Sequence, residues 1–443
     1  MTQGSILKNL IACSIPVIAG NLLQEAYNVV DTLIVGQTLG VEKLAAIGAA
    51  GPLNMLAGGL IMGLTAGCSV LTSQHYGTGR TEQMKRSMAA HILIAAVLAI
   101  VMTIGFSLGT MPLLRLLNTT ADTLQDARSY LRIIYLGIPA MLLYNLLASS
   151  FRAVGDSRTP LFLLICSSLL NIVLDFAFIL GLKWDVAGAA IATVLAQAIS
   201  GLLCLIYTVK RVPLLLPDRG SWKALPGMVR EELKVGIPMG FQFVIIAGGM
   251  MVLQSVLNGF GSDAVAAYTV GGRIQGLCQN PFGSMGTVVA TFVGQNAGVK
   301  QYDRIRSGVK QSLIFTVLLA VVIGGVVWAL ARPITMLFVS AEETAVINLT
   351  REYLNWGCPL LWTLSFLFVC RGALQGLGDG VMPMLGGVLE LCMRAIIPLT
   401  LGEALGFTAI CIAGPAAWAA CGLLMTAAYF VRLRKFHTQE ASA

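Results

Sequence analysis

Residues 25–40 read EAYNVVDTLIVGQTLG, a run in which the carboxylate of Asp31 interrupts a segment that is otherwise apolar enough to cross a bilayer. The chain of 443 residues shares this character, with 56% hydrophobic and 11% charged residues and a mean hydropathy of +0.81. Soluble proteins contain about 25% charged residues. The composition therefore predicts a multi-pass membrane protein, in which Asp31 must be either neutralised or functional.

Windows of about twenty apolar residues, the length that crosses a bilayer as a helix, recur along the chain. We predict an all-α protein with twelve transmembrane helices, at residues 10–39, 44–72, 88–111, 129–150, 160–182, 186–208, 235–258, 264–290, 309–332, 351–375, 383–403 and 408–431. The ten cysteines are scattered through these spans without paired spacing. We expect them to be small buried hydrophobes, with no disulfide and no cysteine-bound metal.

Basic residues are unevenly distributed between the two sets of alternating loops. One set, which includes both termini, holds nineteen lysines and arginines, whereas the other holds seven. The net charge of +8 is therefore explained by sidedness rather than by binding to nucleic acid. By the positive-inside rule we predict that both termini are cytoplasmic and that the protein lies in the cell (inner or plasma) membrane.

The chain repeats itself weakly at a spacing of about 222 residues. Three pairs of segments align in order: LGVEKLAAIGAAGPL (39–53) with FGSDAVAAYTVGGRI (260–274), YGTGRTEQMKR (76–86) with AGVKQYDRIRS (297–307), and FRAVGDSRTPL (151–161) with LQGLGDGVMPM (374–384). Six spans per half make both halves insert the same way up, as parallel repeats. We therefore predict an N-lobe at residues 1–208, a cytoplasmic linker at 209–234, a C-lobe at 235–432 and a cytoplasmic tail at 433–443.

Polar residues gather on single helical faces within the first half. Gln24, Asn28 and Asp31 share one face of the first span, and Asn171 and Asp175 lie one turn apart in the fifth. Thr193 and Gln197 have the same spacing in the sixth span. Each aspartate in a bilayer interior is unfavourable by about 2.5–3.5 kcal/mol, so two of them suggest a site for H⁺ or Na⁺ rather than polar contacts between helices alone.

The second half lacks these acids. At an offset of 221 Asp31 aligns with Val252, and at 223 Asp175 aligns with Pro398 and Asn171 with Arg394. Arg371, Glu390 and Arg394 supply its charges instead. Glu390 and Arg394 form an i,i+4 pair that either neutralises itself or serves the substrate or gating.

No enzyme motif is evident. The three histidines are dispersed, no P-loop occurs, and glycine-rich stretches such as GGLIMGLTAG (58–67) suit close helix packing. We expect no catalytic residues and no cofactor apart from a coupling ion.

The opening IPVIAGNLLQEAYNVVDTLIVGQTLGVEKLAAIG (15–48), the FRAVGDSRTP loop and NIVLD in the fifth span resemble the multidrug and toxic compound extrusion (MATE) family. This resemblance covers essentially the whole chain. It implies two lobes in a V around a central cavity, and an antiporter that exports cationic amphipathic drugs against entering H⁺ or Na⁺ by alternating access. It also implies a small organic cation as substrate, the lipid bilayer as surroundings and no nucleic acid; we expect a monomer.

Carried over by motif, Asp31 resembles the family's essential first-helix acid. Asn171, Asp175 and Thr193 resemble further members of its first-lobe cation site, where Na⁺ is one of the two candidate ions, and Gln24 and Asn28 share the face of Asp31. Pro16 resembles a proline that bends the first helix, and Tyr144 and Asn145 are candidates for the cavity. The absence of acids in spans seven and ten resembles the DinF-type rather than the NorM-type branch.

Three other functions fit parts of the pattern. A flippase of the same superfamily, which moves a lipid-linked or polysaccharide precursor, would use Arg273, Arg371 and Arg394 for an anionic headgroup. An ion channel would need a ring of acids or a filter motif, and neither occurs. A membrane enzyme would need a nucleophile, a metal set or an acid–base pair in a recognisable motif.

Overall fold

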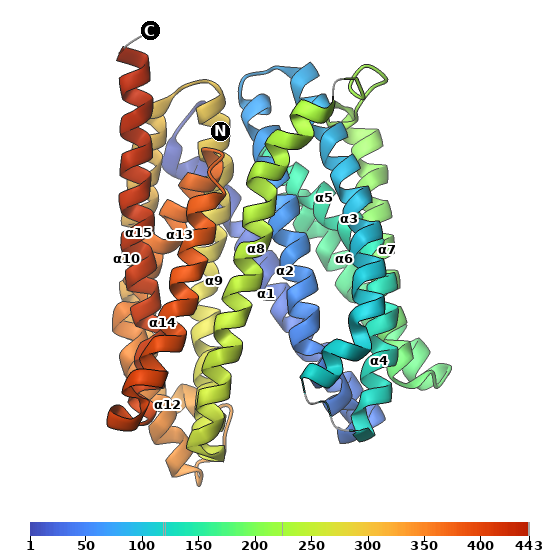
Figure 1. The fold of residues 1–443 in the computed structure, drawn as a ribbon, viewed down its shortest axis with the longest axis vertical. Coiled ribbons are helices and arrows are strands. Elements are labelled where there is room, and N and C mark those ends of the chain that lie inside the picture. The colour runs from blue at the N-terminus through green and yellow to red at the C-terminus, as the bar shows by residue number, and fades with distance from the viewer. Residues whose placement is uncertain (118, 120, 224, 442–443) are drawn as a thin grey trace. The chain divides into compact units, whose positions relative to one another are not determined.

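The computed structural model describes residues 1–441 except residues 118, 120 and 224, and within that part the chain is helical without a β-strand (Figure 1). Contacts divide the chain into two compact units. The N-lobe unit comprises residues 15–240, and the C-lobe unit comprises residues 1–14 and 241–443. The all-α prediction is confirmed.

The helices of the first half are mostly long enough to cross a bilayer. They are α1 (Ile6–Leu39), α2 (Val41–Gly77), α3 (Thr81–Leu116), α4 (Ala121–Leu136), α5 (Ile138–Ala153), α6 (Arg158–Asp175), the π-helical turn η1 (Phe176–Gly181), α7 (Asp185–Arg211) and the short 3₁₀ turn η2 (Pro213–Leu215). Within the N-lobe unit, α5 packs against α2 and α7, and α4 packs against α2, α3 and α7.

The second half repeats this order. Its helices are α8 (Leu225–Leu257), η3 (Asn258–Phe260), α9 (Ser262–Gly298), α10 (Tyr302–Ala329), α11 (Ala331–Thr335), α12 (Thr344–Gly357), η4 (Cys358–Leu360), α13 (Leu361–Gly376), α14 (Val381–Leu405) and α15 (Phe407–Ala441). In the C-lobe unit α13 lies at the centre, against α9, α10 and α15, and α14 packs along α15 (Figure 1).

All twelve predicted spans fall on a helix or on a bent pair of helices. Among the described residues, ten helices are long and apolar enough to span a membrane, or eleven if the bent pair α4–α5 counts as one span. The predicted span at 264–290 falls on α9, whose middle carries Arg273, Gln275 and Asn280 and is therefore less apolar than the others.

Equivalent helices break at equivalent places. The bend of 48° between α4 and α5 lies at Gly137-Ile138-Pro139, and the break between α12 and α13 lies at Gly357-Cys358-Pro359. Proline has no amide proton and its ring clashes with the preceding turn, so a helix bends there. The predicted spans 129–150 and 351–375 are thus both broken helices.

The backbone confirms the internal repeat at the two aligned G-D loops. Gly155 and Gly378 both adopt positive φ, of 91° and 83°, a conformation that suits glycine because it has no Cβ. In both loops the following aspartate, Asp156 or Asp379, accepts a hydrogen bond from the backbone amide three residues on, at 3.0 and 3.1 Å. Two loops with the same turn and the same cap indicate a duplicated fold.

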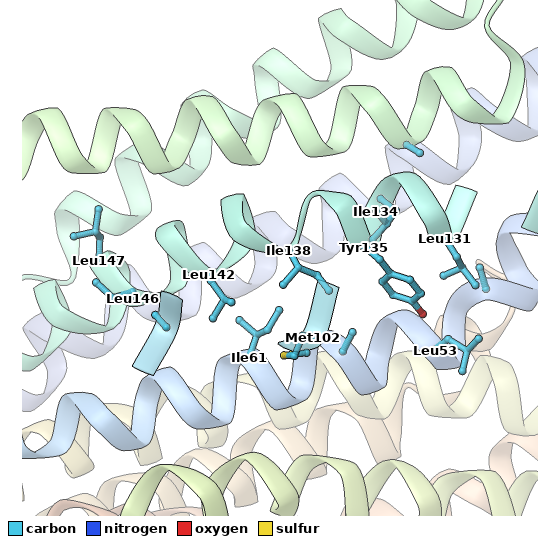
Figure 2. Close-up of a cluster of buried hydrophobic side chains, with 14 of the residues drawn as sticks. Leu53, Ile61, Met102, Leu131, Ile134, Tyr135, Ile138, Leu142, Leu146 and Leu147 are labelled. Atoms are coloured by element: carbon cyan, nitrogen blue, oxygen red, sulfur yellow. The ribbon is translucent and has the colours of Figure 1, made fainter. Parts of the chain in front are cut away.

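The core of the N-lobe unit is apolar and continuous. Figure 2 shows side chains from α4 and α5, including Leu131, Tyr135, Ile138 and Leu142, directed toward α2. On α2 the corresponding layer includes Leu53 and Ile61, which are 2% and 0% exposed. This packing fixes α2 and α4–α5 relative to each other.

The first half of α8 packs on α2 through glycines, as the glycine-rich stretch of α2 predicted. A Cβ added to Gly67 would lie 2.5 Å from the Cα of Gly236, and one added to Gly63 would lie 2.4 Å from the carbonyl oxygen of Met239. Gly63 and Gly67 are one turn apart on α2, and Gly236 and Gly240 are one turn apart on α8. Only the absence of side chains allows the two backbones to approach so closely. We call this contact, with the neighbouring residues of α3, the α8 seam (Figure 1).

The compact units do not coincide with the sequence-based division. The first 14 residues group with the C-lobe unit, and the N-lobe unit extends to Gly240 rather than ending before the linker. The predicted linker 209–234 includes the end of α7 and the first residues of α8. Between them, the hydroxyl of Ser221 and the ammonium of Lys85 lower the pKa of Asp218 to about 2. The predicted tail continues α15 to Ala441, and residues 442–443 lie outside the described part.

Replacement of Gly67 by alanine tests the α8 seam. The new Cβ would overlap the backbone of α8, and overpacking of this kind is unfavourable by about 1–3 kcal/mol. We therefore expect Gly67→Ala to lower the Tm of the purified protein in detergent. The control is Gly51→Ala on the same helix, where no atom lies within 4 Å of the added Cβ. There the better helix propensity of alanine should leave Tm unchanged or raise it. Equal Tm values for both variants would contradict the seam.

Candidate functional site

Two carboxylic acids meet inside the N-lobe unit. Asp31 projects from α1, and Asp175 is the last residue of α6 before the chain continues as the π-helical turn η1. Their side chains are within hydrogen-bonding contact, and Asp175 is 0% exposed. Ionised carboxylates only accept hydrogen bonds, so two carboxyls that bond to each other share a proton. The structure thus brings together the two acids that the sequence singled out.

Asn171 connects this pair to the neighbouring helices. With its amide oriented to satisfy both ends, its nitrogen donates to Asp175 Oδ2 at 2.8 Å and to the Tyr27 hydroxyl at 3.2 Å. Its oxygen accepts from the backbone amide of Thr193 at 3.1 Å. The Tyr27 hydroxyl also hydrogen-bonds to the Thr193 side chain. Asn171, Asp175 and Thr193 therefore form one network across α1, α6 and α7.

Three members of the site were missed from the sequence. Tyr27 lies one helical turn before Asp31, so the i,i+4 spacing could have revealed it. Tyr130 on α4 hydrogen-bonds to Asn54 on α2, and its hydroxyl is close enough to feel the charges of both aspartates. Neither Tyr130 nor Asn54 belongs to a local motif, and only the folded chain brings them to the site.

Gln24 and Asn28 are not bonded to the acids. The Gln24 amide donates to Asn28 Oδ1 at 3.4 Å, and Asn28 is exposed. Gln24 instead lines a cavity of about 310 Å³ within the N-lobe unit, together with Pro16, Tyr144, Asn145 and Gln197. Gln197 Oε1 is buried there without a donor. The residues predicted for the cavity thus lie together, at a place separate from the acid pair.

The acid pair offers oxygen atoms to a small cation. Asp31 Oδ1 and Asp175 Oδ1 are buried, and neither receives a hydrogen bond from a donor in the described part of the chain. Carboxylate, amide and hydroxyl oxygens suit H⁺ or a hard cation such as Na⁺. Among the described residues, no group of three or more His, Cys, Asp and Glu side chains is arranged to hold a metal ion.

The C-lobe unit contains a buried cluster of a different kind. Arg371 on α13 donates to Glu390 Oε1, and Arg394 Nη2 lies 3.6 Å from Glu390 Oε2 one turn along α14. All three side chains are buried, and the Arg371 guanidinium also stacks 5.6 Å above the ring of Phe368. The pair predicted from the sequence is therefore part of a triad that carries one net positive charge.

Comparison with known protein families follows the repeat seen in the structure. The MatE family model matches the chain twice, at residues 16–177 and 238–398. The chain belongs to the MatE family. The two matches begin at Pro16 and Pro238, so in the first helix of each half the offset is 222 residues. This register places Leu253, rather than Val252, opposite Asp31, and Leu253 is an apolar residue that is 2% exposed.

Similar proteins are described as multidrug transporters. A probable multidrug resistance protein YpnP of Bacillus subtilis is 31% identical over 85% of this chain and 84% of its own length. The multidrug export protein MepA of Staphylococcus saprophyticus is 24% identical over 87% of this chain and 86% of its own. A crystal structure of MATE in complex with MaL6 has a TM-score of 0.92 at 22% identity and covers 99% of this chain and 98% of that one. The MATE fold is thereby confirmed, and the protein is a multi-pass membrane transporter of the multidrug efflux family.

Removal of the single carboxylate from the triad tests its structural role. Glu390→Gln would leave two buried guanidinium groups without a counterion, which is unfavourable by about 3–5 kcal/mol. We expect a marked fall in Tm and in the yield of folded protein in detergent. Glu403→Gln, an exposed acid near the end of the same helix, should change neither. An unchanged Tm for Glu390→Gln would mean that the triad does not stabilise the C-lobe unit.

Proposed function

We propose that this MATE transporter is an antiporter, in which protons entering through the Asp31–Asp175 pair drive the export of a cationic amphipathic compound. The direct contact of the two carboxyls is the observation that carries the proposal. Two acids buried in an apolar interior are unfavourable unless they are used, and their exchange of a proton gives them a use.

The coupling ion is a proton because the site is already satisfied by one. A shared proton explains how two acids lie side by side with only Asn171 as a neutral donor between them and α7. Na⁺ is the alternative ion for the same oxygen atoms of Asp31, Asn171, Asp175 and Thr193. It would have to separate the two carboxyls in order to bind both.

Transport proceeds by alternating access of the two lobes. The parallel repeat supports this mechanism, because duplicated lobes provide two similar bodies that can rock against each other. A membrane potential of 100 mV adds about 2.3 kcal/mol per entering charge. Coupling requires only that the proton and the substrate stabilise different states.

The substrate and the orientation follow from the relatives and from charge. The YpnP and MepA relatives are described as multidrug proteins, which supports an organic compound rather than a lipid-linked sugar as the cargo. The excess of basic residues in the loops that adjoin both termini supports cytoplasmic termini in the cell membrane. The protein acts as a monomer without a cofactor.

Efflux from proteoliposomes tests the proposal. An imposed pH gradient should drive export of a fluorescent cation such as ethidium from vesicles with wild-type protein, and a Na⁺ gradient alone should not. Asp31→Asn and Asp175→Asn should each reduce proton-driven efflux at least about tenfold, because an amide cannot release a proton. Glu25→Gln serves as the matched control, since Glu25 is an exposed acid on the same helix.

Two results would overturn the mechanism. Wild-type efflux rates in both aspartate variants would remove the acid pair from coupling. Efflux driven by Na⁺ but not by a pH gradient would assign the same site to Na⁺. If neither gradient moves the dye through folded protein, a transport assay with a labelled lipid-linked sugar becomes the test of the flippase alternative.

A further inference from the structure

Glu232 is a buried acid far along the chain from the Asp31–Asp175 pair. It lies in the first half of α8 and is 0% exposed. Its neighbour Glu231 is exposed. Apolar side chains of α2, α3 and α8 surround the seam at this level, among them Leu64, Ile94, Val229 and Leu233. An acid at this position is therefore removed from water wherever α8 lies on α2 and α3.

The polar contacts of Glu232 are few and come from neutral groups. The Ser87 hydroxyl on α3 donates to Glu232 Oε1 at 2.7 Å, and Thr72 on α2 lies 2.9 Å from the same hydroxyl. The Cys68 thiol on α2 also hydrogen-bonds to the carboxyl. Glu232 Oε2 is buried, and no donor in the described part of the chain reaches it.

No positive charge compensates the carboxyl. Among the described residues, none of the ion pairs involves Glu232. On α3, Lys85 pairs with Asp218, Arg86 is exposed, and His91 is buried with neither ring nitrogen bonded. On α2, His75 interacts with Glu231 and Arg80 rather than with Glu232. On α8 itself, Arg230 and Lys234 are exposed.

An ionised carboxylate in such a place would need several donors or a cation. Glu232 has at most two donors and no cation, so the arrangement suits the neutral acid. The glycine contacts of the α8 seam leave no room for water between the helices: a Cβ on Gly236, one turn after Glu232, would already meet Cys68 Sγ at 3.1 Å. Water would reach the carboxyl only after α8 moves away from α2 and α3.

We propose that Glu232 is a second proton-binding site of this protein, occupied while the α8 seam is closed and emptied to water when the seam opens. Closing the seam therefore takes up one proton, and opening it releases one. In the proposed orientation this proton would exchange with the cytoplasm, because α8 follows the linker between the halves. The site is distinct from the Asp31–Asp175 pair, and its test requires neither substrate nor an ion gradient.

The linkage fixes the direction of the pH dependence. The open state exposes an ordinary glutamic acid, which ionises at a pH of about 4.3, whereas the closed state keeps the proton. Raising the pH therefore favours opening. Because the two states differ by one proton, the opening equilibrium should increase about tenfold per pH unit around neutrality.

Hydrogen–deuterium exchange of the full-length protein in nanodiscs measures this equilibrium. Exchange rates of the amides in residues 225–240 are collected over a pH series and corrected for the intrinsic exchange rate at each pH. Wild-type protein and Glu231→Gln should show the additional tenfold rise per pH unit. Glu232→Gln should show none, because the amide holds the seam closed without a titratable proton. Residues 361–376 in α13 provide an internal reference that should not respond.

Each arm of the experiment can overturn the proposal. A wild-type seam with no additional pH dependence would exclude the site without the use of any variant, so failure of Glu232→Gln to fold would not protect it. Equal slopes in wild type and folded Glu232→Gln would also exclude it. The double variant Asp31→Asn/Asp175→Asn should keep the wild-type slope. Loss of the slope there would assign the proton to the acid pair instead.

Discussion

The neutralisation of charge inside apolar helices is the constraint on which the structure depends. Each ionisable group that the sequence places in a span is satisfied by another part of the fold rather than by water. Asp31 and Asp175 contact each other, Glu390 lies between Arg371 and Arg394, and Glu232 is capped by Ser87. In every case the partners come from different helices, so these contacts also fix how the helices pack.

The same constraint explains why the two halves share a backbone but not a chemistry. The G-D loops, the Gly-x-Pro breaks and the length of the helices recur in both halves. One side-chain contact also recurs. Tyr130 bonds to Asn54 in the N-lobe unit, and Tyr353 donates to Gln275 at 2.6 Å in the C-lobe unit, at offsets of 223 and 221 residues. A duplicated scaffold has therefore kept a polar tyrosine contact while the charged residues near it diverged.

Hydropathy and repeat spacing were sufficient to predict the helical fold, because the bilayer sets the length of each span and proline and glycine mark its ends. They also singled out Asp31, Asn171, Asp175 and Thr193, since polar residues one turn apart share a face. They misjudged Gln24 and Asn28, which lie on the face of Asp31 but bond to each other. They missed Tyr130 and Glu232, because the neighbours of these residues come from helices that are remote in sequence. The contact-based limits at residues 14 and 240 likewise reflect packing that no local pattern encodes.

The acid pair has a counterpart in the C-lobe unit that is built from opposite charge. At an offset of 223, Asn171 corresponds to Arg394, and at 222, Tyr27 corresponds to Gly249. In the N-lobe unit the Tyr27 hydroxyl reaches Asn171. In the C-lobe unit the missing side chain of Gly249 leaves room for Arg394, whose Cδ would lie 3.7 Å from a Cβ added to the glycine. A guanidinium stays charged at any physiological pH, whereas a pair of carboxyls gains and loses a proton. The C-lobe unit therefore carries a fixed positive charge at the position where the N-lobe unit carries an exchangeable one.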